Sequence, residues 1–385
     1  MSHPADRPSG EDGASLRATR VKKSRRAVIK IGSRTLAADR SVYARIARSV
    51  ARRRAAGVEI VLVSSGAIAL GLPAIGLKSR PKEMSKLQAA AAAGQSTLMR
   101  RYEEAFEAQS LHVAQVLLTH ADLADRTRAN NARAALDALL EAGVVPIINE
   151  NDTVAVEEIA FGDNDQLAAL VSALTSADLL VLLSDVDGLL DRSGVRVPVV
   201  RDVSAEAMPL VGGAPIAESR ERVGSGGMAS KLEAARRATL AGAAVVIADA
   251  RAPDTLDRLF DGEDVGTLFV PQDDRLGARK HWILFTLRPR GTVIVDDGAA
   301  EALEARGGSL LAIGVVGVRG TFGAGDAVQI VDARGRELAR GLSALAAIDV
   351  ARVARKKGPE IEALLGRPID AVVHRDDLVV LAPRR

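Results

Sequence analysis

The chain has 385 residues, and 48% of them are hydrophobic, so it can form two domains with well-filled cores and needs no covalent or metal support. It contains no cysteine, which excludes disulfides, thiol catalysis and thiolate metal sites. The formal net charge is only +3, and the five histidines show no metal-ligand spacing, so composition alone favours neither a nucleic-acid binder nor a histidine metal site.

The first predicted element is a basic tail. Residues 1–26 hold seven Lys and Arg against three Asp and Glu, a net +4, so the rest of the chain nets −1. This segment is rich in Arg, Ser, Gly and Pro and lacks the apolar core of a secretory signal, so we predict that residues 1–24 are disordered. No later run of about 18 apolar residues occurs, and we expect a cytoplasmic protein without a membrane span.

Short apolar runs alternate with helical patterns between residues 25 and 270. The predicted strands are Ala27–Ile31, Ile60–Val63, Val113–Leu118, Val144–Ile148, Leu179–Leu183 and Ala243–Ala248. The predicted helices between them are Tyr43–Ala56, Lys86–Ala108, Asn131–Ala142, Gln166–Leu174 and Ala229–Ala241. Consecutive apolar positions indicate strands covered on both faces, so we predict an α/β domain with a mostly parallel sheet sandwiched by helices.

The pattern changes after Val270. Residues 271–290 are polar and contain Pro289, and we predict a linker there. Residues 291–385 contain short strands with Gly turns at Thr292–Val295, Val315–Val318 and Ala327–Val331, a helix at Ala300–Arg306, and closing apolar runs at Ala371–Val373 and Leu378–Leu381. We predict a separate, small β-rich domain. Gly323–Asp326 matches the anion-hole signature of sugar kinases, but a strand follows it, so we interpret it as a turn.

Two strands of the first domain end in residues suited to anions. Lys30 lies on an otherwise apolar strand, where an ammonium group is costly to bury unless it meets an anion, and Gly32 lets a phosphate approach the backbone. Ser64-Ser65-Gly66 leads from the next strand into a helix, whose N-terminus favours carboxylate or phosphate. A lysine reaching solvent and an ordinary Ser cap are the alternatives.

The most informative pair of motifs follows the fourth strand. Asn149–Asp152 comes directly after it, and Gly162–Asp165 opens the next helix. Each could be simple turn chemistry. Both fall at the edge of the sheet where ligands bind in such folds, and together they offer carboxylates for an ammonium group and amides for a carboxylate. We predict a site for a free amino acid.

Two further segments suit a nucleotide. Ser184-Asp185-Val186-Asp187-Gly188 ends the fifth strand with polar groups that fit a sugar or base. Gly224-Ser225-Gly226-Gly227-Met228-Ala229-Ser230-Lys231 leads into a helix and offers amides and an ammonium group for phosphates, although it lacks the Gly-Lys-Ser/Thr order of a Walker loop. A flexible surface loop is the alternative.

The ordered set VIKIGS, VSSGAI, INENDTV, FGDNDQLAA, LLSDVDGL and GSGGMASK resembles the amino-acid kinase family over about residues 24–270, and the segment from Gly291 is similar to a PUA domain. The resemblance implies that Lys30 and Lys231 are catalytic and contact ATP phosphates, with Asp165 organising them. It places the amino acid at Ser65, Asn149, Asp152 and Asn164. It places the nucleotide at Ser184, Asp185, Ser225, Gly226, Gly227, Met228, Ala229, Ser230 and Lys231.

The same resemblance implies a function. We expect ATP-dependent phosphorylation of the side-chain carboxylate of L-glutamate, the first step of proline biosynthesis, with Mg²⁺ carried by the nucleotide, feedback inhibition by proline and assembly into a homo-oligomer. The chain departs from the family pattern at Arg34, where a small hydroxyl residue is usual, and at Leu345-Ala346-Ala347, which replaces a Tyr-Asn-Ser stretch of the PUA-like domain.

Two alternatives remain open at this stage. A sibling kinase would act on N-acetylglutamate, aspartate or a nucleoside monophosphate, but an N-acetylated acceptor has no ammonium group for Asp152. RNA binding through the PUA-like domain is the other alternative. Residues 291–385 hold thirteen Lys and Arg against thirteen Asp and Glu and a single aromatic residue, Phe322, which is a poor composition for phosphate contacts and base stacking.

Overall fold

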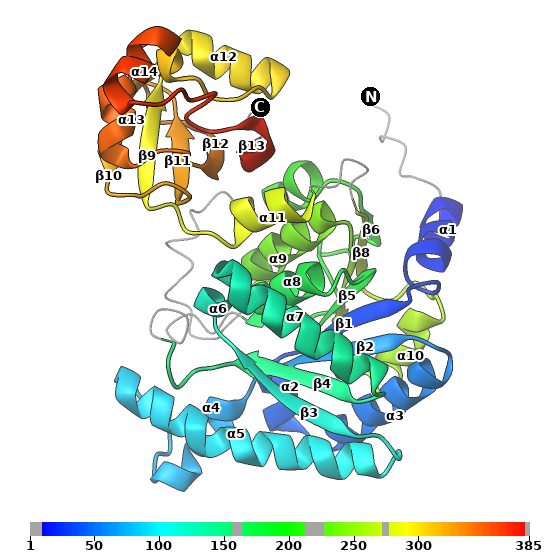
Figure 1. Ribbon diagram of the computed structural model, residues 1–385. Helices are drawn as coiled ribbons and strands as arrows, with labels where there is room; N and C mark the ends of the chain where they lie inside the picture. Colours follow the sequence, from blue (N-terminus) through cyan, green and yellow to red (C-terminus); the bar gives the residue numbers. More distant parts are fainter. Residues whose placement is uncertain (1–9, 156–163, 212–226, 272–276, 382–385) are drawn as a thin grey trace. The chain divides into compact units, whose positions relative to one another are not determined.

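The computed structural model describes residues 10–155, 164–211, 227–271 and 277–381, and the chain divides into two compact units, Met1–Arg275 and Leu276–Arg385. The first unit is built on an eight-stranded sheet in the order β3-β4-β2-β1-β5-β7-β8-β6 (Figure 1). Its strands are β1 (Arg26–Ile31), β2 (Glu59–Ser64), β3 (Val113–Leu118), β4 (Val145–Glu150), β5 (Leu179–Ser184), β6 (Val199–Val200), β7 (Ala244–Asp249) and β8 (Thr267–Phe269).

Strand direction follows the prediction. Neighbouring strands of this sheet are parallel, with the exception of the antiparallel pair β7 and β8. The central strands are buried along nearly their whole length, because helices cover both faces of the sheet (Figure 1). The predicted α/β class with a mostly parallel sheet between helices is therefore confirmed.

The helices of the first unit fill the connections between strands. They are α1 (Gly10–Arg20), α2 (Ser33–Ala38), α3 (Ser41–Ala55), α4 (Ala67–Gly71), α5 (Met84–Glu107), α6 (His120–Ala124), α7 (Arg126–Glu141), α8 (Asn164–Leu174), α9 (Met228–Ala241) and α10 (Thr255–Phe260), with short turns at η1 (Pro73–Ile75), η2 (Val203–Ala207) and η3 (Met208–Leu210). No helix in the described ranges combines the length and apolar character that crossing a membrane requires.

Two glycines bring α4 and α5 into backbone contact. A Cβ added to Gly71 would lie 1.8 Å from the carbonyl oxygen of Ala90, and one added to Gly94 would lie 1.8 Å from that of Ala67. Only residues without a side chain fit such a crossing. The contact holds α4, which follows the turn after β2, directly against the middle of α5.

Residues 1–24 differ from the prediction of a disordered tail. Residues 1–9 lie outside the described part of the chain, but residues 10–20 form α1, and Arg17 is only 2% exposed. The prediction is wrong for residues 10–24 because the segment is held by long-range hydrogen bonds: the Arg17 guanidinium donates to the backbone carbonyls of Pro198, Val265 and Gly266. These acceptors are distant in the sequence, so the local composition does not indicate them.

The second unit carries a five-stranded sheet in the order β10-β9-β11-β12-β13. Its elements are α11 (Ala278–Phe285), β9 (Gly291–Val295), α12 (Asp297–Arg306), η5 (Ala312–Gly314), β10 (Val315–Gly320), β11 (Ala327–Val331), β12 (Glu337–Leu342), α13 (Ala347–Val353), α14 (Gly358–Leu365), η6 (Arg375–Asp377) and β13 (Leu378–Val380). The predicted small β-rich domain is confirmed.

Two details of this unit refine the predictions. The predicted linker includes α11, whose Ile283 is fully buried and whose Leu284 carbonyl accepts a hydrogen bond from Arg340 at 3.1 Å, so residues 278–285 are part of the second unit. Gly323–Asp326 lies between β10 and β11, and the Gly323 amide donates to the Asp326 carboxylate at 2.8 Å. The turn interpretation of this motif is confirmed.

Candidate active site

The sheet order fixes where the polar motifs meet. Strand β1 lies between β2 and β5, and the chain passes from β4 on one side of β1 to β5 on the other. A reversal of this kind opens a crevice at the carboxyl ends of the strands. The residues that follow β2 and β4 therefore lie on one side of β1, and those that follow β5 lie on the other.

A buried cluster of three charges lies at this junction. Lys30 of β1 and Lys231 of α9 place their Nζ atoms 2.6 and 3.1 Å from the two carboxylate oxygens of Asp165, which opens α8. The Asp165 side chain is 0% exposed. Burial disfavours its charged form, but the two ammonium groups outweigh burial and hold the pKa of Asp165 below its ordinary value. The structure thus brings the three predicted catalytic residues together.

Asn164, the residue before Asp165, joins the motifs on the β2 and β4 side. Its Nδ2 lies 2.8 Å from the Ser64 carbonyl oxygen, 2.7 Å from Ser65 Oγ and 3.1 Å from Asn149 Oδ1. Gly66 adopts φ 106°, a left-handed conformation that lets the chain turn sharply from β2 into α4 and leaves Ser65 at the tip. Three of the four predicted amino-acid ligands therefore share one hydrogen-bonded cluster.

Sequence reasoning missed Gln95 of α5. The Asn149 amide donates to Gln95 Oε1 at 2.9 Å, and Gln95 Nε2 donates to Gln115 Oε1 at 2.9 Å. This chain of amides fixes which way the Asn149 side chain points. Gln95 directly follows Gly94, so the close crossing of α4 and α5 sets its position. A glutamine within a helix carries no sequence signal of such a role.

Asp152, the fourth predicted amino-acid ligand, lies in the turn after β4. Its side chain is half-buried, and burial raises the pKa of Asp152 to about 6, an effect that the charge of Arg80 partly opposes. A half-buried carboxylate in such a position is suited to a cationic ligand. Gly162 and Asp163, the start of the second predicted run, lie outside the described residues.

The residues after β5 form the other side of the site. Ser184 Oγ donates to Asp185 Oδ1 at 3.1 Å, and the guanidinium of Arg34 pairs with Asp185 Oδ2 at 3.0 Å. Burial raises the pKa of Asp185, but these hydrogen bonds and the charge of Arg34 outweigh it, so the pKa lies below its usual range. Arg34, the departure noted in the sequence, therefore reaches this side of the site.

The glycine-rich segment leads into α9. Ser225 and Gly226 lie outside the described residues, and Gly227 is the N-cap of α9 with an extended backbone at φ −60° and ψ 171°. Met228, Ala229 and Ser230 form the first turn, which lies at the positive end of the helix dipole. Gln166 donates to the Ser230 carbonyl at 3.0 Å and so ties this turn to α8.

The donor set for a metal is limited in this part of the chain. Among the described residues no group of three His, Asp or Glu side chains could hold a metal ion, and both oxygens of Asp165 already face ammonium groups. A Mg²⁺ ion here fits best as a partner of the phosphates of a nucleotide, since it commonly binds through phosphates and keeps several waters.

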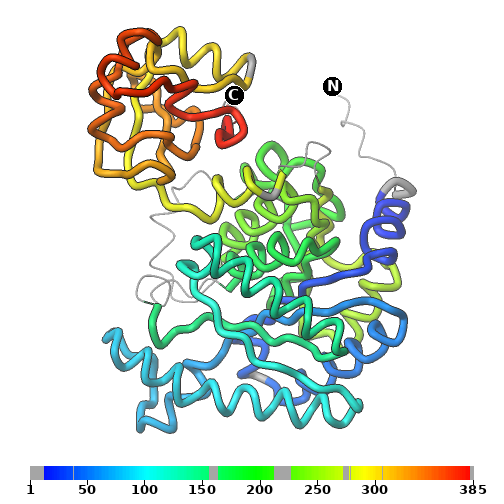
Figure 2. The backbone as a smooth tube through the Cα atoms, in the orientation of Figure 1, coloured from blue at the N-terminus to red at the C-terminus, as the bar shows by residue number. Residues whose placement is uncertain are grey.

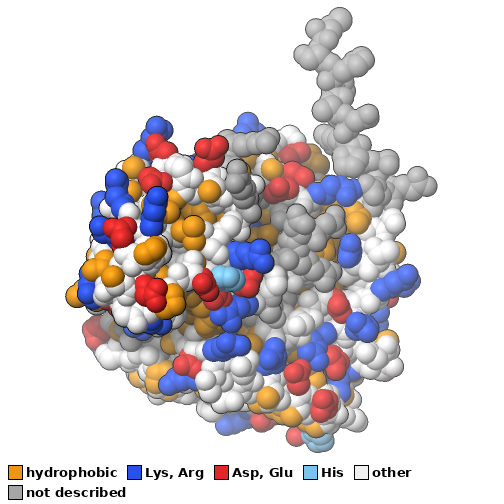
Figure 3. All heavy atoms as spheres, turned by 45° about the horizontal axis from the view of Figure 1, so that its top comes forward, with side chains coloured by type: hydrophobic (Ala, Val, Ile, Leu, Met, Phe, Trp, Pro, Cys, Tyr) orange, Lys and Arg blue, Asp and Glu red, His pale blue; other side chains and the backbone are white. Residues whose placement is uncertain are grey.

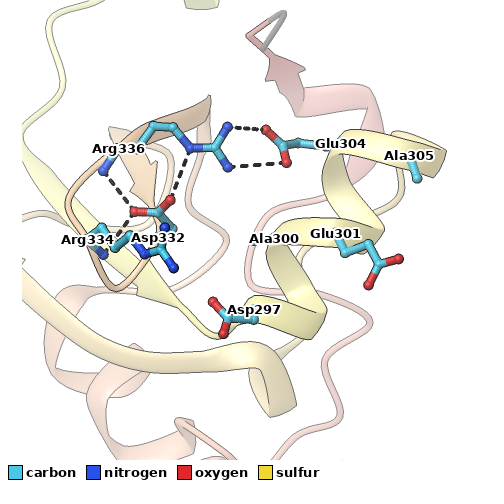
Figure 4. Close-up of a pocket in the computed structure, with 8 residues that line it drawn as sticks. All are labelled: Asp297, Ala300, Glu301, Glu304, Ala305, Asp332, Arg334 and Arg336. Carbon is cyan, nitrogen blue, oxygen red and sulfur yellow. Dashed lines mark hydrogen bonds and ion pairs between the residues drawn. The ribbon is translucent and has the colours of Figure 1, made fainter. Parts of the chain in front are cut away.

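A separate pocket of about 590 Å³ lies in the second unit, between α12 and the turn from β11 to β12 (Figure 4). The charged residues among its lining are Asp297, Glu301, Glu304, Asp332, Arg334 and Arg336. Arg336 pairs with Glu304 at 2.7 Å and with Asp332 at 3.1 Å, so its charge is already neutralised. Among the other charged residues of the lining, the two carboxylates of Asp297 and Glu301 outnumber the one cation, Arg334, so the pocket is unsuitable for phosphate.

Comparison with known proteins adds the following. Residues 25–249, more than half of the chain, match the model of the amino acid kinase family, and residues 291–365 match that of the PUA domain. Glutamate 5-kinase of Pelobacter propionicus is 46% identical over 378 residues, which cover 95% of this chain and 100% of that protein. Glutamate 5-kinase of Citrifermentans bemidjiense is 45% identical over 375 residues, with 95% and 100% covered. A solved N-acetylglutamate synthase from Neisseria gonorrhoeae, complexed with coenzyme A and L-arginine, aligns at 18% identity with a TM-score of 0.48 over 68% of this chain and 64% of that one.

Proposed function

The chain belongs to the amino acid kinase family, and we propose that it transfers the γ-phosphoryl group of ATP to the side-chain carboxylate of L-glutamate. The observation that carries this proposal is the buried cluster of Lys30, Asp165 and Lys231. On one side of it lie the amide-rich residues that follow β2 and β4, and on the other side lie the residues that follow β5. The family assignment made from the motifs is confirmed, and the relatives' shared activity favours glutamate over the sibling substrates.

On the amide-rich side we assign the amino acid. The ammonium group of glutamate would lie against Asp152, which is half-buried and is not paired with two lysines as Asp165 is. Ser65, Asn149 and Asn164 would hold the carboxylate groups through hydroxyl and amide donors. An N-acetylated acceptor would leave Asp152 without a cation and would bury a carboxylate at a cost.

On the other side we assign the nucleotide. Ser184 and Asp185 would contact its sugar or base, and the phosphates would lie at the start of α9, along Ser225, Gly226, Gly227, Met228, Ala229 and Ser230 up to Lys231. Helix N-termini favour phosphate because their amides are unpaired and their dipole is positive there. Lys30, on the strand between the two sides, would contact the phosphates together with Lys231.

The chemistry needs positioning and charge neutralisation more than proton transfer. A glutamate side chain has a reference pKa of about 4.3, so it is already an ionised nucleophile near neutral pH and requires no general base. Its approach to the γ-phosphate brings two anions together, and Lys30 and Lys231 offset that repulsion. Asp165 holds both ammonium groups in place before the substrates arrive, which reduces the reorganisation needed in the transition state. Mg²⁺ bound with the nucleotide would add further positive charge at the phosphates.

RNA binding as the main function is not favoured. In the face shown in Figure 3, basic and acidic side chains are interspersed, and the pocket of the second unit is acidic (Figure 4). A nucleic-acid-binding surface would instead concentrate Lys and Arg on one face.

Feedback inhibition by proline and assembly into a homo-oligomer remain part of the proposal. Titration of the activity with proline tests the first, and light scattering tests the second.

Acceptor selectivity tests the proposal. With Mg²⁺ and ATP, ADP formation should depend on L-glutamate, and kcat/KM for L-glutamate should exceed that for N-acetylglutamate or L-aspartate by at least about tenfold. N-acetylglutamate tests the requirement for the ammonium group, and L-aspartate tests the requirement for the length of the side chain. A higher kcat/KM for N-acetylglutamate would contradict the assignment of Asp152, and a higher one for aspartate would contradict the assignment of the substrate.

A further inference from the structure

The N-terminal helix α1 is anchored by one buried guanidinium. Arg17 donates to the carbonyl oxygens of Val265 at 2.8 Å, Gly266 at 2.9 Å and Pro198 at 2.9 Å, and it pairs with Asp264 at 3.0 Å. Figure 2 shows the dark-blue helix beside the yellow-green segment that carries residues 264–266. Helix α1 precedes residue 25, where the family match begins. Arg17 therefore lies outside the segment that matches the family model.

Two of the three carbonyls that Arg17 holds, those of Val265 and Gly266, belong to the turn that precedes β8, residues 264–266. Gly266 adopts φ +64°, and a Cβ added there would lie 2.2 Å from the carbonyl oxygen of Ile247, so this turn packs directly on the backbone of β7. Arg196 pairs with Asp264 at 2.9 Å and also donates to Gly266. Two guanidinium groups thus fix the turn, and Arg17 is the more deeply buried of the two.

The next residue, Thr267, holds the loop that follows β5. The Leu189 amide donates to Thr267 Oγ1 at 2.8 Å, and the same hydroxyl donates to the Val197 carbonyl at 2.6 Å. Gly188 lies so close that an added Cβ would be 2.5 Å from Thr267 Oγ1. Gly188 and Leu189, at the end of the loop that begins at Asp185, therefore lie directly on Thr267.

We infer that Arg17 is a positioning residue for the nucleotide side of the site. It acts through the turn at residues 264–266 and through Thr267, which together fix the loop that begins at Asp185. This inference rests on the proposed function, which assigns Ser184 and Asp185 to the nucleotide. The cluster of Ser65, Asn149 and Asn164 belongs to the other half of the sheet and shares none of these contacts. Loss of Arg17 should therefore weaken ATP binding and spare glutamate binding.

The test compares Arg17→Met with Arg20→Met, which removes the same charge from the same helix. Calorimetric titration with ATP and Mg²⁺, without glutamate, should show Kd raised by about tenfold or more for Arg17→Met and by less than about twofold for Arg20→Met. Steady-state kinetics should show the same split, with KM for ATP raised and KM for glutamate unchanged. A merely structural role would lower the melting temperature and leave this ratio unaltered.

Two further variants keep the test decisive if Arg17→Met does not fold. Arg17→Lys keeps the charge but loses the planar fork of donors, and an intermediate rise in Kd for ATP is expected. Thr267→Val removes the hydroxyl that accepts from the Leu189 amide and should by itself raise the Kd for ATP. The double variant with Arg17→Met and Thr267→Val should raise the Kd by less than the product of the two single increases, because both changes act on the same loop.

Equal rises in KM for ATP and glutamate, or an unchanged Kd for ATP in Arg17→Met and Thr267→Val, would overturn the inference. The proposed function fails on a different result, namely a wild-type protein that transfers no phosphoryl group to glutamate. The ATP titration still distinguishes Arg17→Met from wild type in that case, because it requires no turnover.

Discussion

Replacing Asp165 with asparagine removes the carboxylate that both site lysines contact and keeps the size of the side chain. Lys30 Nζ and Lys231 Nζ lie 2.6 and 3.1 Å from its oxygens, and the side chain is 0% exposed. Breaking a buried ion pair by removing one partner costs about 3–5 kcal/mol, because the other charge is left uncompensated. Two ammonium groups are left here, so we expect Asp165→Asn to lose stability at the upper end of that range.

The assay is urea unfolding at neutral pH, with Asp261→Asn as the matched control. Asp261 pairs with Arg53 at 2.8 Å but is 58% exposed, and exposed pairs contribute about 0–1 kcal/mol. Turnover of Asp165→Asn should fall with stability, since its lysines are no longer held. Added ATP should narrow the stability gap between wild type and Asp165→Asn, because phosphate charge replaces the lost carboxylate.

The stability difference between wild type and Asp165→Asn should also depend on pH. Burial disfavours the Asp165 carboxylate, but the two lysines outweigh it and hold its folded-state pKa below the ordinary value of about 3.9. The stability that this depressed pKa supplies is complete above about pH 4 and is lost as the pH falls through the folded-state pKa. The gap between wild type and Asp165→Asn should therefore narrow in acid. A gap below about 1 kcal/mol at neutral pH, or one that widens in acid, would refute the reasoning.

Three further predictions concern the acceptor side, the phosphate side and the helix crossing. Lys231→Ala should lower kcat by at least about a hundredfold, and near-normal turnover would remove this lysine from the mechanism. Asp152→Asn should raise KM for glutamate and leave KM for ATP unchanged. In wild type, KM for glutamate should rise below about pH 6, where Asp152 becomes protonated, and a profile that is equally steep in Asp152→Asn would contradict the ammonium contact. Gly94→Ala should cost about 1–3 kcal/mol of stability, since its Cβ would lie 1.8 Å from the Ala67 carbonyl oxygen. Gly308→Ala, where an added Cβ meets nothing within 4 Å, serves as its control, and equal losses in the two variants would exclude the steric explanation.

Much of the first domain could be predicted because its strands are buried on both faces. Apolar runs such as Ala27–Ile31 and Leu179–Leu183 coincide with β1 and β5 to within one residue. The same burial singled out Lys30 as a candidate site residue, because an ammonium group on a strand covered on both faces needs an anion. The anion it meets in the structure is Asp165, which opens a helix more than a hundred residues later. Its partnership with Lys30 came from family resemblance, because charge patterning alone does not pair residues at that separation.

The features that escaped prediction depend on contacts between distant segments. Strands β6 and β8 have two and three residues, too few for any periodicity. Helix α1 is polar in composition, and its stability depends on carbonyl acceptors that lie 181 to 249 residues from Arg17. Gln95 contacts Asn149 only because Gly94 lets α5 approach α4 closely. Each of these is a property of the packed molecule and has no local signature.

The most direct test of the central claim is chemical trapping of the product. An acyl phosphate reacts with hydroxylamine to form a hydroxamate, so incubation with ATP, Mg²⁺ and L-glutamate should yield the 5-hydroxamate of glutamate in step with ADP formation. The account predicts this product from L-glutamate in wild type and a loss of at least about a hundredfold in its rate for Lys231→Ala. ADP formation without hydroxamate, or hydroxamate from N-acetylglutamate alone, would contradict it.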